Sequence, residues 1–324
     1  MNKIIHIINP LDNAAGGSEQ RSIHLFYLLR PFAEVILWTN SKPDSRLPHD
    51  LNIKKINVKE GQYPLSGIMI FVGVYHFIGH WVFNVKSDRT ILIYNTGNPA
   101  GLARTLLLLS ALKTKIEIVY ASNWLMKQVG YPGKVEHSYI DIQSRFIPNK
   151  LSDYLTNSFV IGRMSRDDEV KHHFPDIELY KKLVQSGCQI KIMGGTTLNK
   201  MIGNQSNITL KPACDLPSET FLQHLDCFYY RTNDTFFEAS GRVVVEAMAC
   251  ALPVVVFSRG GYVEYIEHGK DGFIFNTQEE AYNLIMTLKQ NINLRRAIGE
   301  AARKKIEKLY DSKYVNSTRD FYLK

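Results

Sequence analysis

The sequence is poor in the features that mark several large protein classes. Its 324 residues contain four cysteines and no C-x-x-C pair, so we expect free thiols in a reducing cytoplasm rather than a disulfide scaffold. No apolar run reaches the roughly 18 residues that a membrane-spanning helix needs. The first ten residues, MNKIIHIINP, predict a strand followed by proline and not a signal peptide.

Two common nucleotide-binding signatures are missing as well. The chain has neither a G-x-G-x-x-G fingerprint nor a Walker P-loop. It also has no D-x-D pair to hold an obligatory metal, so we expect neither a metal nor a cofactor. The basic residues are scattered and no nucleic-acid-binding motif is present, which makes nucleic acid an unexpected partner.

The positive charge of the chain is unevenly distributed. Residues 1–150 hold 17 Lys+Arg and 10 Asp+Glu, whereas residues 151–324 hold 22 and 21. Such an excess in the first half indicates an anionic partner, for example an anionic lipid surface or a phosphorylated glycan. A solvated basic surface explains the excess equally well.

The length of the chain suits two domains of about 150 residues each. The short apolar run Ile4–Ile8 predicts a strand, and the all-apolar run Val254–Phe257 predicts a buried parallel strand. The leucine-rich segment Leu102–Leu112 has apolar residues on all faces and predicts a buried core helix; a helix lying in a membrane interface is the alternative. The polar segment 149–157 predicts the domain boundary.

The most informative stretch runs from residue 236 to 275. A loop with Glu238 and Gly241 precedes a predicted helix, Val243–Ala251, that carries Glu246 in its first turn. The buried strand described above follows, and Gly260-Gly261 then precedes another helix. Two helix N-termini thus meet the carboxyl ends of strands, where open α/β sheets bind ligands and where free N–H groups favour anions.

This stretch resembles the donor half of the retaining, group 1 glycosyltransferases of the two-Rossmann-domain type (GT-B). The signature of that family is a pair of glutamates separated by seven residues, then E-A-M-A, a G-P-V-V strand and G-G-x-x-E. The matching elements are Glu238 and Glu246, Glu246-Ala247-Met248-Ala249, Leu252-Pro253-Val254-Val255 and Gly260-Gly261-Tyr262-Val263-Glu264. The departures are Ala251 for glycine, Ala239-Ser240 for glycine-aromatic and Arg242 for an apolar residue.

The resemblance implies an α/β fold of two facing Rossmann-like domains with an interdomain cleft. The N-terminal, acceptor-side domain is expected over residues 1–152 and the donor domain over residues 153–312. A terminal helix over residues 313–324 is expected to cross back to the first domain.

The resemblance also implies roles for residues of the donor domain. Glu246 is expected to accept hydrogen bonds from the ribose, and Glu238 from the transferred sugar. Arg163 and Lys171 are expected to neutralise the donor diphosphate, with Arg166 as a rival to Lys171. The remaining expected donor contacts are through backbone groups, at Gly194, Gly241, Arg242, Val243 and Val244.

In the N-terminal domain, Gly16 and Gly17 are expected to approach the donor phosphates and the acceptor, whereas a tight turn with positive φ is the structural alternative. Ser18 predicts the cap of the following helix. The resemblance places a histidine beside the reacting sugar, and His76 suits this role better than His80 because it falls nearer the end of a strand; a purely structural histidine is the alternative.

The expected activity is transfer of a hexose, with retention, from a nucleotide diphosphate sugar to a glycan or lipid-linked acceptor. The donor sugar is expected to be UDP-linked. We expect it to serve bacterial cell-surface polysaccharide synthesis, in the cytoplasm or on the inner face of the membrane. A nucleotide-sugar epimerase or hydrolase, and an inactive protein that binds sugar nucleotides, are the alternatives.

Overall fold

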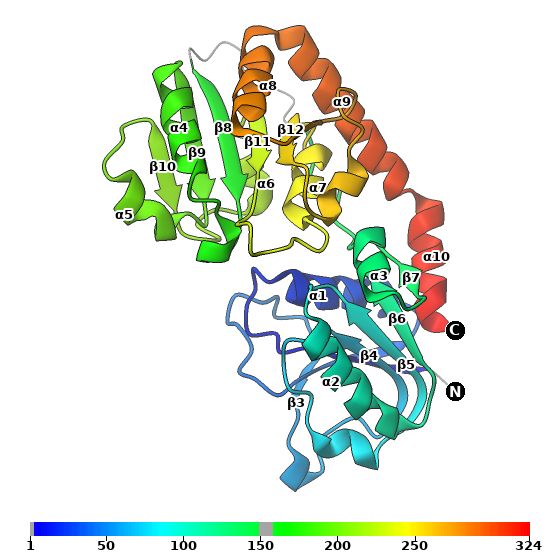
Figure 1. Ribbon diagram of the computed structural model, residues 1–324. Coiled ribbons are helices and arrows are strands. Elements are labelled where there is room, and N and C mark those ends of the chain that lie inside the picture. Colours follow the sequence, from blue (N-terminus) through cyan, green and yellow to red (C-terminus); the bar gives the residue numbers. More distant parts are fainter. Residues whose placement is uncertain (1–2, 149–157) are drawn as a thin grey trace. The chain divides into compact units, whose positions relative to one another are not determined.

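The computed structural model describes residues 3–148 and 158–324, and the predicted boundary segment 149–157 therefore lies outside the described residues. The chain forms two compact units. The first contains the residues up to Tyr139 together with Ser312–Lys324, and the second contains Ile140–Asp311. Each unit has a sheet of parallel strands covered by helices (Figure 1), which confirms the predicted α/β class.

The first unit is built on a seven-stranded sheet in the order β3-β2-β1-β4-β5-β6-β7. Its strands are β1 (Ile4–Ile8), β2 (Glu34–Thr39), β3 (Ile53–Lys55), β4 (Ser66–Val72), β5 (Lys86–Tyr94), β6 (Ile116–Tyr120) and β7 (Lys134–Val135). Its helices are α1 (Gly17–Leu29), α2 (Pro99–Leu109), α3 (Asn123–Val129) and α10 (Ser312–Leu323), with 3-10 turns η1 (Val58–Glu60), η2 (His80–Asn84) and η3 (Ser110–Leu112).

The central strands β1 and β4 are buried on both faces because helices cover both faces of the sheet. Alternate residues such as Ile5 and Ile7 of β1 pack with α1 and with Tyr322 of α10 in one core cluster. The strand order reverses between β1 and β4, which are neighbours in the sheet. The loops that leave these two strands, with Gly16 and His76, therefore lie at the topological switch point, where open α/β sheets bind ligands.

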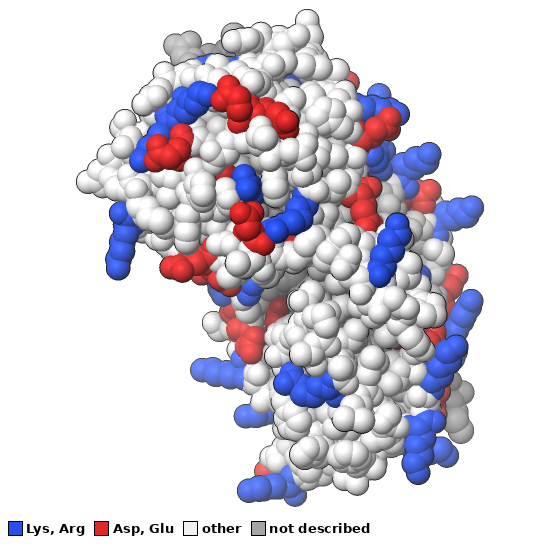
Figure 2. Space-filling model, viewed as in Figure 1, with Lys and Arg blue, Asp and Glu red and all other residues white. Residues whose placement is uncertain are grey.

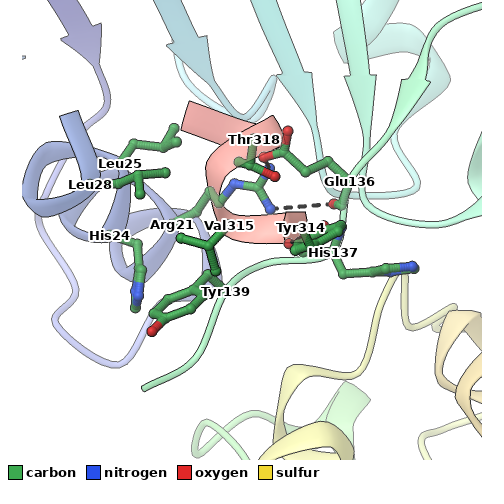
Figure 3. A pocket seen from close by; sticks show the side chains of 10 residues that line it. All are labelled: Arg21, His24, Leu25, Leu28, Glu136, His137, Tyr139, Tyr314, Val315 and Thr318. Carbon is green, nitrogen blue, oxygen red and sulfur yellow. Dashed lines mark hydrogen bonds and ion pairs between the residues drawn. The ribbon is translucent and has the colours of Figure 1, made fainter. Parts of the chain in front are cut away.

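Helix α10 packs in the first unit through Tyr322, whose hydroxyl bonds to the carboxylate of a buried ion pair. Arg21 of α1 donates to Glu136, and the Tyr322 hydroxyl donates to the same carboxylate at 3.0 Å. Figure 3 shows this pair beside a small cavity lined by residues of α1, α10 and the segment after β7. The last helix of the chain thus completes the core of the first unit.

The second unit is built on a six-stranded sheet in the order β10-β9-β8-β11-β12-β13. Its strands are β8 (Phe159–Met164), β9 (Cys188–Met193), β10 (Ile208–Lys211), β11 (Cys227–Tyr230), β12 (Val254–Phe257) and β13 (Phe273–Phe275). Its helices are α4 (Asp176–Gln185), α5 (Asn199–Ile202), α6 (Ser218–Leu222), α7 (Arg242–Ala249), α8 (Gln278–Gln290) and α9 (Ile292–Leu309), with η4 (Glu169–Lys171), η5 (Thr196–Leu198) and η6 (Gly261–Tyr265). The order reverses between β8 and β11, so the loops after these strands lie at its switch point.

The structure corrects three local predictions in the first unit. Ser18 does not cap α1, because Gly16 is the N-cap and the Ser18 hydroxyl bonds to Asn95 instead. A tight turn does lead into α1, closed by the bond from Gly16 N–H to the Asn13 carbonyl oxygen at 2.8 Å, but neither Gly16 nor Gly17 has the positive φ that this alternative required. The predicted core helix, now α2, is buried along one face, and Leu107 on another face is 77% exposed.

The second unit differs from prediction at its boundary and in α7. Residues from Ile140 onward belong to it because Arg303 of α9 donates to the carbonyl oxygens of Ile142 and Phe146. Helix α7 begins at Arg242, so Glu246 is its fifth residue and lies beyond the first turn. The helix expected behind Gly260-Gly261 is the short 3-10 turn η6.

Candidate functional site

The loops that follow β8 and β11 bring two of the predicted residues into direct contact. Lys171 ends η4, and its ammonium donates to Glu238 Oε2 at 2.6 Å across 67 positions of sequence. The Tyr230 hydroxyl, at the end of β11, donates to the same oxygen at 2.9 Å. A partly buried carboxylate that accepts two such bonds keeps a fixed position at the switch point.

The electrostatics of this cluster favour an ionised Glu238. Burial by itself raises the pKa of the carboxyl group, but the charge and hydrogen bond of Lys171 outweigh it, and the net pKa is lowered. Burial also raises the pKa of Tyr230, so its phenol stays a proton donor to Glu238. The site therefore presents a carboxylate and an ammonium side by side.

Arg163 has a different position from the one expected of a diphosphate ligand. It lies on β8 and is 1% exposed. Its guanidinium donates to the carbonyl oxygens of Lys171 and Arg231, the latter at 2.9 Å. Arg163 thus fixes the backbone that carries Lys171, and in the structure it is a positioning residue rather than an exposed cation.

Arg166, the predicted rival of Lys171, lies on the loop between β8 and η4. Its side chain is 44% exposed, and its guanidinium is 3.5 Å from the Asp168 carboxylate. Its charge contributes to the lowered pKa of Glu238. Arg166 is therefore the more exposed of the two cations, whereas Lys171 is the one in contact with Glu238.

The second predicted glutamate is paired within its own helix. Arg242 Nε donates to Glu246 Oε1 at 2.7 Å, one helical turn apart. Their side chains are 14% and 7% exposed. Burial raises the pKa of Glu246, and the nearby guanidinium of Arg242 opposes that rise.

Two glycines at the predicted backbone contacts have conformations that exclude larger residues. Gly241 has φ +67°, and a Cβ there would lie 2.6 Å from the Tyr262 side chain. Gly194 has φ +78°, and its Cβ would lie 1.9 Å from the Ser165 carbonyl oxygen. The backbone at both positions is therefore specified by glycine, and Val243 and Val244 follow Gly241 in the first turn of α7.

Two further polar residues of this region were missed by the sequence analysis. His172 is buried and bonds through Nε2 to the Gly194 carbonyl oxygen at 2.8 Å; burial lowers its pKa to about 3, so the ring is neutral. Asp167 accepts the N–H groups of Thr196 and Ala213 at 2.7 Å each. Each directly follows a predicted basic residue, Asp167 after Arg166 and His172 after Lys171, which was the available signal, but their partners lie on other loops.

The remaining predicted residues, Gly16, Gly17 and His76, belong to the first unit. Among the described residues neither ring nitrogen of His76 has a hydrogen-bond partner, and burial lowers its pKa to about 4. The imidazole is therefore neutral at pH 7. A Cβ at Gly16 would lie 1.8 Å from the Glu19 carboxylate, whereas Gly17 faces open space.

No group of three His, Cys, Asp or Glu side chains in residues 3–148 and 158–324 is arranged to hold a metal ion. Within the same residues no helix has the length and apolar character needed to cross a bilayer. Among the described residues, basic side chains that act on Glu238 and Glu246 are Lys171, Arg166, Arg242 and Arg145, so an anionic ligand is the chemistry that the second unit favours.

Sequence comparison connects the second unit with known enzymes. Residues 152–305 match the family model of the glycosyl transferases group 1. The capsular polysaccharide biosynthesis glycosyltransferase CapM of Staphylococcus aureus is 23% identical over 197 residues, which are 57% of this chain and 51% of CapM. The sulfoquinovosyl transferase SQD2 of Arabidopsis thaliana is 39% identical over 92 residues, 25% of this chain and 18% of SQD2. The chain thus matches about half or less of the length of these relatives.

Structural comparison covers nearly the whole chain. HepE of Anabaena, solved in complex with UDP-glucose, is similar with a TM-score of 0.75 and 18% identity over 99% of both chains. WaaG, a glycosyltransferase involved in lipopolysaccharide biosynthesis, gives a TM-score of 0.71 and 12% identity over 98% of this chain and 99% of WaaG. At these identities the likeness concerns the GT-B fold.

Proposed function

We propose, from the membership of residues 152–305 in the group 1 glycosyltransferases, that the protein transfers a hexose from a nucleotide diphosphate sugar to an acceptor hydroxyl with retention. The observation that carries this proposal is the contact of Lys171 and Tyr230 with Glu238 at the switch point of the second unit. An ionised carboxylate can accept hydrogen bonds from sugar hydroxyls, and an adjacent ammonium group can bind a diphosphate. The two groups together therefore suit a ligand that contains both a sugar and a diphosphate.

Each residue of the site has a proposed part in the reaction. Glu238 accepts hydrogen bonds from hydroxyls of the transferred sugar and orients it. When the bond between the sugar and the diphosphate breaks, negative charge grows on the leaving group, and the Lys171 ammonium offsets it. Arg163 keeps Lys171 in place, and the N–H groups at the start of α7 face the phosphates. Gly16, Gly17 and His76 of the first unit have proposed roles in contacting the sugar and the acceptor.

The proposed donor is a UDP-linked hexose, used without a metal or cofactor. Glu246 would accept hydrogen bonds from the ribose, and the loop at Gly194 would pack against the nucleotide. HepE, whose fold the chain shares, was solved with UDP-glucose, which supports the choice of UDP. The two basic side chains near Glu238 would take the place of a divalent cation.

The proposed acceptor is a glycan or lipid-linked intermediate of bacterial cell-surface polysaccharide synthesis. CapM and WaaG, named for capsular polysaccharide and lipopolysaccharide biosynthesis, support this choice. The basic residues of the first unit are scattered over its surface in Figure 2, and α2 exposes Leu107 beside the exposed Arg104. We propose that this unit contacts an anionic membrane at the cytoplasmic face.

Replacing Glu246 by alanine is expected to weaken donor binding. Losing a hydrogen bond from a hydroxyl to a charged group typically costs about 1.5–3 kcal/mol, which corresponds to roughly 10- to 150-fold in the dissociation constant. Thermal shift with UDP and UDP-hexoses measures this, because a ligand at 100 times its dissociation constant adds about 2.7 kcal/mol of stability. Equal stabilisation of the parent and Glu246→Ala proteins by every nucleotide would contradict the site.

Binding to anionic vesicles is expected to fall steeply with salt, because exposed charges are screened over about 8 Å at physiological ionic strength. Lys54, Lys55 and Lys59 are exposed on the first unit. Each lysine near an anionic surface contributes about 1 kcal/mol, so reversing all three to glutamate should weaken binding at least about 100-fold. The same reversals on exposed lysines of the second unit, such as Lys181, serve as the control.

Sedimentation with anionic and neutral vesicles at low and high salt gives the readout. A salt-dependent Michaelis constant without vesicle binding would indicate a soluble anionic glycan acceptor instead. If neither vesicle binding nor acceptor affinity responds to salt or to the reversals, the basic excess is only a solvated surface.

A further inference from the structure

Arg242, the first residue of α7, is a charged residue at a position where the family pattern has an apolar one. Its side chain does not extend into solvent: it folds along the first turn of α7 and donates to Glu246 Oε1 at 2.7 Å. Both side chains are largely buried, at 14% and 7% exposure. A buried ion pair is costly to assemble and costly to break, so its presence at a proposed ribose contact requires a reason.

The other charged groups facing Glu246 come from neighbouring elements. Arg145, on the segment before β8, and Glu219, on α6, both act on it electrostatically. These two are paired with each other at 3.0 Å, which uses much of the Arg145 charge. The Cys250 thiol on the last turn of α7 is also close, and burial raises its pKa, so it is neutral. Arg242 is thus the cation in direct contact with the carboxylate.

We infer that Arg242 is a positioning residue for the donor: it holds Glu246 ionised and in one orientation, so that the carboxylate accepts ribose hydroxyls across the neutral pH range. Arg242 binds Oε1, which leaves Oε2 for the ribose. This inference rests on the proposed function, in which Glu246 contacts the ribose. The Arg242 side chain thus positions Glu246, whereas the backbone N–H of Arg242 is expected to contact the donor itself.

The inference predicts a change in pH dependence. Burial raises the pKa of Glu246 and Arg242 lowers it. A carboxylate that must be ionised loses binding as the pH falls through its pKa, by about tenfold for each further unit. Without Arg242 the pKa moves upward, so the loss of donor affinity begins at higher pH. Apart from the titration of UDP itself, the parent protein should lose less UDP affinity between pH 8 and pH 6 than a variant that lacks the Arg242 guanidinium.

The experiment is a calorimetric titration of UDP into the intact protein between pH 5.5 and 8.5. Arg242→Ala and Arg242→Met, which keeps most of the apolar stem, should each lose more UDP affinity between pH 8.5 and pH 5.5 than the parent, approaching about tenfold for each unit below the pKa of Glu246. Arg242→Lys should restore most of the parent profile. Lys181→Ala, which removes an exposed cation of α4, is the matched control and should behave as the parent.

Glu246→Gln separates this effect from titration of the UDP phosphates. Its binding should be weak and should vary with pH only as UDP itself does, and adding Arg242→Ala should not change that profile. Parent-like pH profiles for both Arg242→Ala and Arg242→Met, with weak binding by Glu246→Gln, would overturn the inference alone. Parent-like binding by Glu246→Gln would instead overturn the ribose contact of the proposed function.

Discussion

Replacing Lys171 by alanine is expected to lower the turnover number by about 10²–10³, the usual effect of losing one preorganised group that stabilises charge in the transition state. The ammonium is held 2.6 Å from Glu238 by the backbone contact of Arg163. It is therefore in place before the reaction begins, and in the proposed reaction it takes the part that a divalent cation would otherwise play. EDTA should leave the activity of the parent protein unchanged. Steady-state kinetics with saturating donor measures both effects.

The controls for this prediction test whether the variant stays folded and whether Lys171, rather than Arg166, is the functional cation. Lys171→Ala leaves the buried Glu238 without its cation, so the thermal unfolding midpoint has to be compared first. Glu238→Ala should also mainly lower turnover, and Lys181→Ala should do nothing. Inactivation by EDTA that Mg²⁺ or Mn²⁺ restores would show that a metal does the work assigned to Lys171. A damaging Arg166→Ala with a silent Lys171→Ala would show that Arg166 is the functional cation.

Replacing Glu136 by alanine is expected to destabilise the first unit by about 3–5 kcal/mol, because it leaves Arg21 buried without a counter-charge. Glu136 is 1% exposed and Arg21 is 4% exposed. The same carboxylate accepts from Tyr322 at 3.0 Å and from Lys134 at 2.7 Å. Its loss should also release α10, which urea unfolding and limited proteolysis near the C-terminus would detect.

Two matched variants distinguish an unpaired charge from a simple loss of contacts. Lys134→Ala removes a half-exposed partner of Glu136 and should cost no more than about 1 kcal/mol. The double change Arg21→Met with Glu136→Leu removes both charges and should recover most of the stability. A double variant as unstable as Glu136→Ala would contradict the electrostatic explanation.

The sequence predicted the strands better than the contacts between loops. The run Val254–Phe257 has the bounds of β12, because uninterrupted apolar residues mark a strand that is buried on both faces. The cap at Ser18 was wrong because that side chain meets Asn95, 77 positions away. Leu107 was assigned to the core because composition does not tell which face of a leucine-rich helix is covered.

The same limit applies to the candidate site. Motif spacing identified Glu238, Glu246 and Lys171, and the structure shows how two of them meet. The buried role of Arg163 and the bond from Tyr230 to Glu238 depend on the packing of β8 beside β11. Likewise, the pairing of Arg242 with Glu246 follows from a helix that begins at residue 242. These features arise from tertiary neighbours that no local pattern specifies.

Retaining transfer of a hexose from a UDP-linked donor can be measured by following a label in the sugar into the product. UDP-hexoses labelled in the sugar are incubated with the protein and a mixture of glycan and lipid-linked acceptors, and the product bond is analysed by NMR. The account predicts acceptor-dependent release of UDP, and label in the acceptor with the anomeric configuration of the donor. Glu238→Gln should abolish both. Donor that is bound but never consumed, labelled free sugar, an epimerised sugar nucleotide or an inverted linkage would contradict it.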